Sequence, residues 1–112
     1  MQSLKTKQVL FLGEQDGAGE RELKSKLVEC FSNGTGIELA FLARVSFSEV
    51  PGPQVALCVK GDKTYAQSVV DCVGRIFATL FETTQHLDIL YLTDLQVAEI
   101  KRVASPFYQA SS

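Results

Sequence analysis

Three cysteines and one histidine are the residues whose side chains could support covalent or metal chemistry. Cys30, Cys58 and Cys72 lie far apart in the chain, and His86 is the only histidine. A zinc site needs several nitrogen or sulfur ligands, and a nucleophilic thiol needs a neighbour that lowers its pKa. No CxxC or Cys–His motif supplies either, so we expect no metal and no catalytic residues. A thiol-dependent enzyme using Cys58 or Cys72 ranks third among three hypotheses. The cysteines lie in apolar stretches, which predicts buried free thiols in a cytoplasmic protein.

A glycine-rich loop, "GEQDGAG", precedes the first predicted helix and contains Gly13, Gly17 and Gly19. It lacks the Lys-Ser/Thr ending of a P-loop and the spacing of the dinucleotide fingerprint. We therefore expect no bound cofactor, and a plain connection is the simplest interpretation. In ferredoxin-like modules that sense amino acids, the first strand-to-helix loop binds effectors. The second hypothesis is therefore a domain that binds a small molecule, an amino acid, through the Gly13–Gly19 loop.

The chain closes on "SPFYQASS", where two aromatic residues follow a proline. Pro106 fixes its own φ and disfavours helical geometry at the residue before it, so the last helix must end there. Phe107 and Tyr108 then either pack back on the domain as a plug or form an exposed hook for a partner. We expect the plug, with Phe107 more buried than Tyr108 and residues 109–112 loose.

Composition and charge disfavour nucleic-acid-binding and membrane proteins. The chain has 112 residues and a net charge of −2, with acidic and basic residues mixed along it. It shows no basic platform, and the strand at 54–60 lacks the aromatics on which RNA-recognition motifs stack bases, so we expect no nucleic-acid partner. The apolar run at 9–12 is too short for a membrane span or a signal peptide. We expect a single domain over residues 1–112, located in the cytoplasm and not at a membrane.

Hydrophobic periodicity predicts a β-α-β-β-α-β order followed by a terminal helix. The predicted strands cover residues 7–14, 37–47, 54–60 and 86–92, and the helices cover 20–32, 64–80 and 93–103. The first strand is apolar throughout and is predicted to be central in the sheet. Thr64 with Gln67, and Thr93 with Gln96, have capping-box spacing. This order is typical of the α+β ferredoxin-like fold, an antiparallel sheet with two helices on one face.

The predicted strands have two apolar faces. Ile37, Val55 and Leu87 mark the face covered by the helices, where Leu39 and Phe77 should be buried. The other face carries Ala40, Leu42, Ala56, Cys58, Leu90 and Leu92, which is too apolar to face water. Our leading hypothesis is therefore a non-enzymatic interaction or regulatory domain. Its surface would bind a protein partner or a second copy through Leu42, Cys58, Leu90 and Leu92, joined by Phe107 and Tyr108.

Several segments together resemble a known family. "QVLFLGEQ", "LVECFSN", "IELAFLARV", "VALCVKGD" and the closing "SPFYQ" occur in an order similar to the C-terminal domain of the SseB family, the enhanced serine sensitivity proteins. The similarity covers residues 9 to 108. It implies a bacterial cytoplasmic setting, no established enzymatic activity, and a C-terminal domain separated from the N-terminal domain of longer members. No individual residue receives a role from this resemblance.

Overall fold

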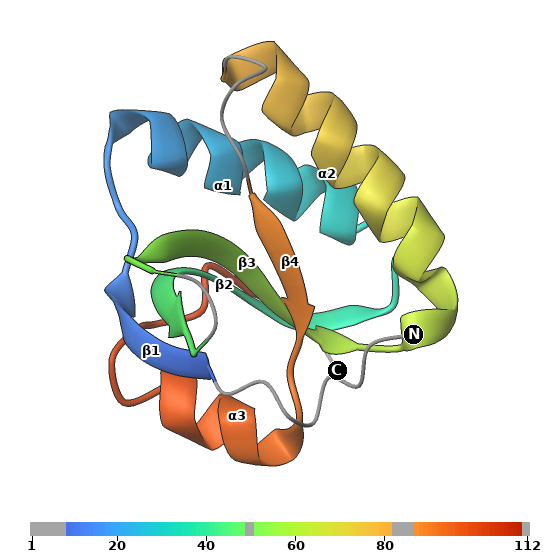
Figure 1. Cartoon of the computed structure of the whole chain (residues 1–112). Coiled ribbons are helices and arrows are strands. Elements are labelled where there is room, and N and C mark those ends of the chain that lie inside the picture. Colours follow the sequence, from blue (N-terminus) through green and yellow to red (C-terminus); the bar gives the residue numbers. More distant parts are fainter. Residues whose placement is uncertain (1–8, 49–50, 82–86, 111–112) are drawn as a thin grey trace.

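The chain folds into a mixed β-sheet with helices on both faces (Figure 1). The computed structural model describes residues 9–48, 51–81 and 87–110. The elements are β1 (Val9–Glu14), α1 (Ala18–Phe31), β2 (Ile37–Phe47), β3 (Gln54–Gly61), the 3-10 helix η2 (Lys63–Tyr65), α2 (Ala66–Leu80), β4 (Asp88–Tyr91), α3 (Asp94–Ile100) and β5 (Tyr108–Gln109). The α+β class and the predicted order of elements are confirmed.

The strand order differs from the ferredoxin-like arrangement. Neighbouring strands follow the order β1-β2-β3-β4, with antiparallel pairing except between β3 and β4, which are parallel. β1 is thus an edge strand, and its prediction as a central strand was wrong. Helices α1 and α2 lie on one face of the sheet and α3 lies on the other (Figure 1). The order of elements along the chain does not fix which strands become neighbours in the sheet. Here α1 brings β2 back beside β1, so these two strands pair directly.

A β-bulge near the start of β2 reverses the side-chain alternation expected there. Ile37 pairs with Gly61 and Leu39 pairs with Lys60, so Glu38 is an extra residue in this strand. One extra residue sends every following side chain to the opposite face. Leu39 therefore lies on the α3 side, and the prediction that the other two helices cover it was wrong. Ile37 and Leu42 both face α1 and α2.

Each face of the sheet has its own hydrophobic core. The core beneath α1 and α2 consists of Leu23, Leu27, Phe31, Ile37, Ala40, Leu42, Leu57, Val59, Val69 and Val73, and Val55, Phe77 and Leu87 pack against it. The core beneath α3 consists of Phe11, Phe41, Ala43, Val45, Ala56, Cys58, Leu92, Ile100 and Ala104. The predicted placement of Ile37, Val55, Leu87 and Phe77 is confirmed. The second face, expected to be open, is covered by α3 of the same chain.

The closing segment contains β5, which pairs with the same edge of β2 as β1 does, at the other end of that strand. β1 pairs with residues 43–47 of β2, and β5 pairs with Leu39 and Ala40. The amide of Phe107 donates to the carbonyl of Ala40 at 2.9 Å, and the amide of Ala110 donates to Glu38 at 2.9 Å. These contacts order positions 109 and 110, which were predicted to be loose, because the backbone there completes the sheet. Positions 111 and 112 lie outside the described residues.

Candidate functional site

The six residues of the predicted interaction surface do not form one exposed face. Leu42 is only 1% exposed and lies beneath α1 and α2. Cys58 and Leu92 are buried beneath α3, and Leu90 packs at the margin of that core. Phe107 and Tyr108 pack on the α1 side. The bulge in β2 places Leu42 on the opposite face from Cys58, Leu90 and Leu92, and α3 covers the face that carries Cys58.

The closing aromatics pack on the end of α1. The ring centroid of Phe31 lies 6.4 Å from that of Phe107 and 5.6 Å from that of Tyr108, the latter in an edge-on arrangement. The Tyr108 hydroxyl donates to the carbonyl of Phe31 at 3.2 Å. Both aromatics are half-buried. The segment is therefore a plug on the domain, as predicted, and not a free hook.

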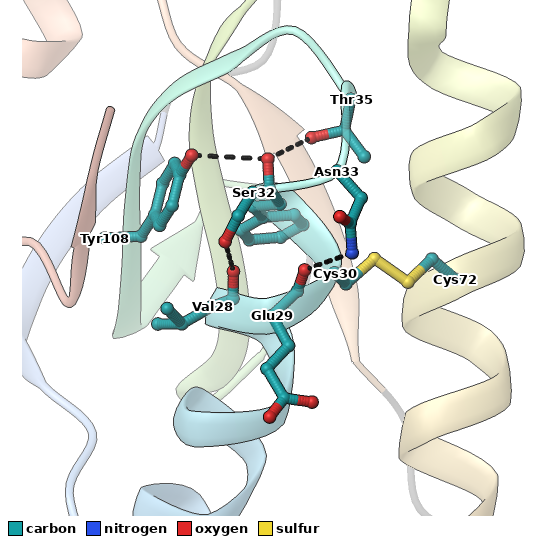
Figure 2. Close-up of a disulfide and its surroundings, with 9 residues drawn as sticks. Val28, Glu29, Cys30, Ser32, Asn33, Thr35, Cys72 and Tyr108 are labelled. Atoms are coloured by element: carbon teal, nitrogen blue, oxygen red, sulfur yellow. Dashed lines mark hydrogen bonds between the residues drawn. A yellow bond between two sulfur atoms is a disulfide. The ribbon is translucent and has the colours of Figure 1, made fainter. Parts of the chain in front are cut away.

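A disulfide joins Cys30 of α1 to Cys72 of α2, close to the plug (Figure 2). The two Cα atoms lie 6.6 Å apart, and 42 residues separate the cysteines in sequence. The prediction of free thiols was wrong for this pair, because the packing of α1 against α2 brings together residues that are remote in sequence. Around it, the side chains of Ser32 and Asn33 donate to carbonyls of the last turn of α1.

Cys58 is the one free cysteine, and it is buried in the α3 core. Desolvation by burial raises the pKa of its thiol to about 12, so the thiol is protonated at neutral pH. A thiolate is the nucleophilic form of cysteine, and neither Cys58 nor the disulfide-bonded Cys72 offers one. His86 lies outside the described residues.

The Gly13–Gly19 loop is fastened to α1 by ion pairs. The ammonium of Lys24, which is buried, lies 3.0 Å from a Glu14 carboxylate oxygen and 3.2 Å from one of Asp16. The hydrogen bond from Lys24 lowers the pKa of the Asp16 carboxyl. Arg21 pairs with Asp16 on the exposed side. Lys24 and Arg21, the basic residues at the start of α1, are thus already paired with carboxylates and are not available to bind a phosphate at the loop.

A cavity of about 330 Å³ lies between the start of α1, the end of α2 and the sheet. Its lining is mainly apolar and consists of Glu20, Leu23, Leu42, Gln54, Val55, Phe77, Phe81 and Leu87. The rings of Phe77 and Phe81 stack with centroids 4.7 Å apart. This volume and lining are typical of small-molecule sites, which are concave and mostly apolar with few polar groups.

Gly17 and Gly19 lie close to two side chains that line the cavity. A Cβ atom at Gly17 would lie 2.6 Å from a carboxylate oxygen of Glu20, and one at Gly19 would lie 3.4 Å from the ring of Phe81. Bare backbone at these positions lets both side chains lie against the loop. Gly13 is instead close to the guanidinium of Arg44. Gly17 and Gly19 therefore contact residues that line the cavity, whereas none of Gly13, Gly17 and Gly19 is itself part of the lining.

The strand β1 presents apolar side chains to solvent. Leu10 is 64% exposed and Leu12 is 40% exposed, whereas Phe11 between them is buried in the α3 core. β1 has β2 on one side, and no strand of the described residues pairs with its other edge. An edge strand with exposed leucines is a surface to which another strand can add.

Sequence reasoning did not name the lining of the cavity as a site. It singled out Gly17 and Gly19, which contact Glu20 and Phe81 of the lining but do not line the cavity themselves. The signal for Glu20 was its place directly after the loop, whereas Phe77 and Phe81 are brought there by packing.

Among the described residues, no group of histidine, cysteine or acidic side chains could hold a metal ion, and no helix is long and apolar enough to cross a membrane.

Comparison of the chain with protein-family models, with curated proteins and with solved structures finds no match.

Proposed function

We propose that this chain is a non-enzymatic interaction domain and that β1 is its docking strand. The observation that carries the proposal is the exposure of Leu10 and Leu12 on an edge strand whose buried residue, Phe11, anchors it to the core. Fully burying one leucine contributes about 1.5–3 kcal/mol. Two leucines beside unpaired backbone groups therefore provide both apolar area and hydrogen bonds for a partner strand.

The occupant we propose is β1 of a second copy of the chain. In a two-fold antiparallel pairing centred on Phe11, the exposed leucines of both copies lie near the centre of the joined sheet. β1 has a bulge at Leu12, where its register on β2 shifts, so the new pairing is not a regular ladder at that residue. Glu14 is the only charged residue within β1. In this pairing the two Glu14 side chains lie at opposite ends, so no like charges face each other across the new ladder.

The resemblance to the C-terminal domain of the SseB family supports a regulatory role in a bacterial protein. A cytoplasmic location remains a prediction. The Cys30–Cys72 disulfide weighs against a permanently reducing compartment, because disulfides persist mainly where the environment is oxidising.

The test is the oligomeric state measured by analytical ultracentrifugation over a concentration series. Leu10→Lys adds a charge to the docking strand and should weaken dimerisation at least about tenfold, since losing one buried leucine contact costs 1.4 kcal/mol or more. Leu95→Lys is the matched control, because Leu95 is a leucine with 71% exposure that belongs to α3 and not to the docking strand. A strict monomer at every concentration, or equal effects of the two substitutions, would refute the docking strand.

A second candidate function is the binding of a small effector. The cavity favours it, because two of its lining residues, Glu20 and Phe81, contact Gly17 and Gly19 of the loop named from the sequence. Binding of any small ligand there should shift the backbone amide resonances of the lining residues. Dimerisation and effector binding use separate surfaces, so each can be tested without the other.

A further inference from the structure

Among the described residues, the cavity has one charged group in its lining, the carboxylate of Glu20. One of its oxygens accepts a hydrogen bond from the Gln15 side-chain amide at 3.1 Å. The amide of Gln54 is the other polar side chain of the lining, and the remaining lining residues are apolar. A ligand in this cavity therefore meets an apolar wall and one negative charge.

The two basic residues at the start of α1 do not balance that carboxylate. Lys24 is engaged by Glu14 and Asp16, and Arg21 is engaged by Asp16. Within the part of the chain that the structure describes, the cavity lining contains no lysine or arginine. A carboxylate or phosphate on the ligand would lose its hydration without gaining an ionic partner, which is costly in an apolar site. A cationic group would instead form a charge-assisted hydrogen bond with Glu20.

The apolar residues of the lining offer a place for an apolar part of a ligand. Phe77 and Phe81 form a stacked aromatic pair in the lining, which also contains Leu42 and Val55 of the sheet. An aromatic or branched aliphatic body gains both burial and ring contact there. The cavity volume of about 330 Å³ is at the lower end of the range for small-molecule sites. This size suits a compact ligand.

We propose that the cavity binds a small primary amine with an apolar body, its ammonium group on Glu20 and its body against Phe77 and Phe81. The proposal rests on the second candidate function above and specifies its ligand class. It differs from the amino-acid expectation, because the free carboxylate of an amino acid would find no cation among the described residues of the lining.

Four probes with the same phenyl group test the charge preference. Phenethylamine is cationic, phenylacetate is anionic, phenylalanine is zwitterionic and phenethyl alcohol is neutral. Each is titrated into the ¹⁵N-labelled protein, and amide shifts of the lining residues give the dissociation constant. We expect phenethylamine to bind at least about tenfold more tightly than the other three.

Three variants locate the binding site. Glu20→Gln keeps the shape but removes the charge, and should weaken phenethylamine binding about tenfold. Glu22→Gln is the matched control, because Glu22 is exposed on the same helix and does not line the cavity. Val55→Phe fills the cavity and should abolish binding with Glu20 intact. Circular dichroism checks that each variant is folded.

Two results would overturn the proposal, and they differ in what they leave standing. Tighter binding of phenylacetate or phenylalanine at the same residues would refute the amine class but retain effector binding. The absence of shifts at the lining residues with all four probes would refute both. Equal affinities for Glu20→Gln and Glu22→Gln would refute the role of the Glu20 charge.

Discussion

Leucine truncations at two positions of β2 test the reversed alternation of that strand. Leu42→Ala and Leu39→Ala remove the same atoms from one strand, three residues apart. Leu42 is 1% exposed in the centre of the core beneath α1 and α2. Leu39 is half-buried at the margin of the core beneath α3. The alternation expected from the sequence makes the opposite assignment, with Leu39 beneath the two long helices.

The two substitutions should differ clearly in their effect on the free energy of unfolding. Truncating Leu42 removes three buried carbons, and at about 0.8 kcal/mol per carbon the transfer contribution alone is about 2.4 kcal/mol. The void left among well-packed neighbours adds to this, which gives a total of about 3–4 kcal/mol. The half-buried Leu39 has less to lose, and we expect about 1 kcal/mol.

Urea denaturation followed by far-UV circular dichroism is the suitable assay, because the chain has no tryptophan for fluorescence. The midpoint should fall for Leu42→Ala about three times as far as for Leu39→Ala, with little change in the slope of the transition. If Leu39→Ala costs as much as Leu42→Ala, or more, the bulge at Glu38 and the placement of both leucines are wrong.

Three further predictions concern the plug, the disulfide and the loop. Phe107→Ala should lower the free energy of unfolding by about 2 kcal/mol, below the 3–5 kcal/mol for a fully buried phenylalanine; a change within about 0.5 kcal/mol in a thermal melt would contradict the plug. Reduction of Cys30–Cys72 should destabilise the domain by about 4 kcal/mol, given the 42-residue separation, whereas a variant with serine at both positions should not respond to reductant. The pKa of Asp16 is lowered in the folded state from 3.8, so its contribution to stability is complete above 3.8 and is lost as the pH falls through the folded value. Lys24→Gln should weaken this loss in urea midpoints measured across that pH window.

The elements could be predicted because their signals are local. The side-chain alternation predicted for residues 39–47 is present in β2. The strand also ends at Phe47, as the turn residues that follow it predict. Thr93 forms the predicted capping box with Gln96, because the four residues involved are consecutive. The similar spacing of Thr64 and Gln67 forms none: η2 intervenes, and Asp62 caps it instead.

The strand order and the bulge could not be predicted because they depend on contacts between distant segments. The bulge lies where β2 and β3 approach most closely, since a Cβ at Gly61 would collide with the backbone of Gly36. Gly36 itself has a φ of 73°, in the region that favours glycine. Two glycines 25 residues apart carry no visible signal that they meet.

The candidate site, like the fold, was predictable from the sequence only where its signal is local. The loop glycines are recognisable, because three glycines before a helix are a local pattern. The cavity depends on where the end of α2 meets the loop, which brings Phe81 to within contact of Gly19. The disulfide also had no signal, because the cysteines become neighbours only when α1 packs against α2.

The shared row of β1 and β5 has a consequence for synthesis of the chain on the ribosome. The first and last described strands lie end to end along one edge of β2, and the Ser105 amide reaches the Glu14 carboxylate at 3.3 Å. The β5 half of this edge cannot be paired until residues 107–110 have left the exit tunnel, although β1, α1 and β2 emerge early. Until then the nascent domain carries an open strand edge and the uncovered ring of Phe31. A ribosome stalled before residue 107 would therefore hold a sheet able to pair with strands of its neighbours on the same messenger RNA.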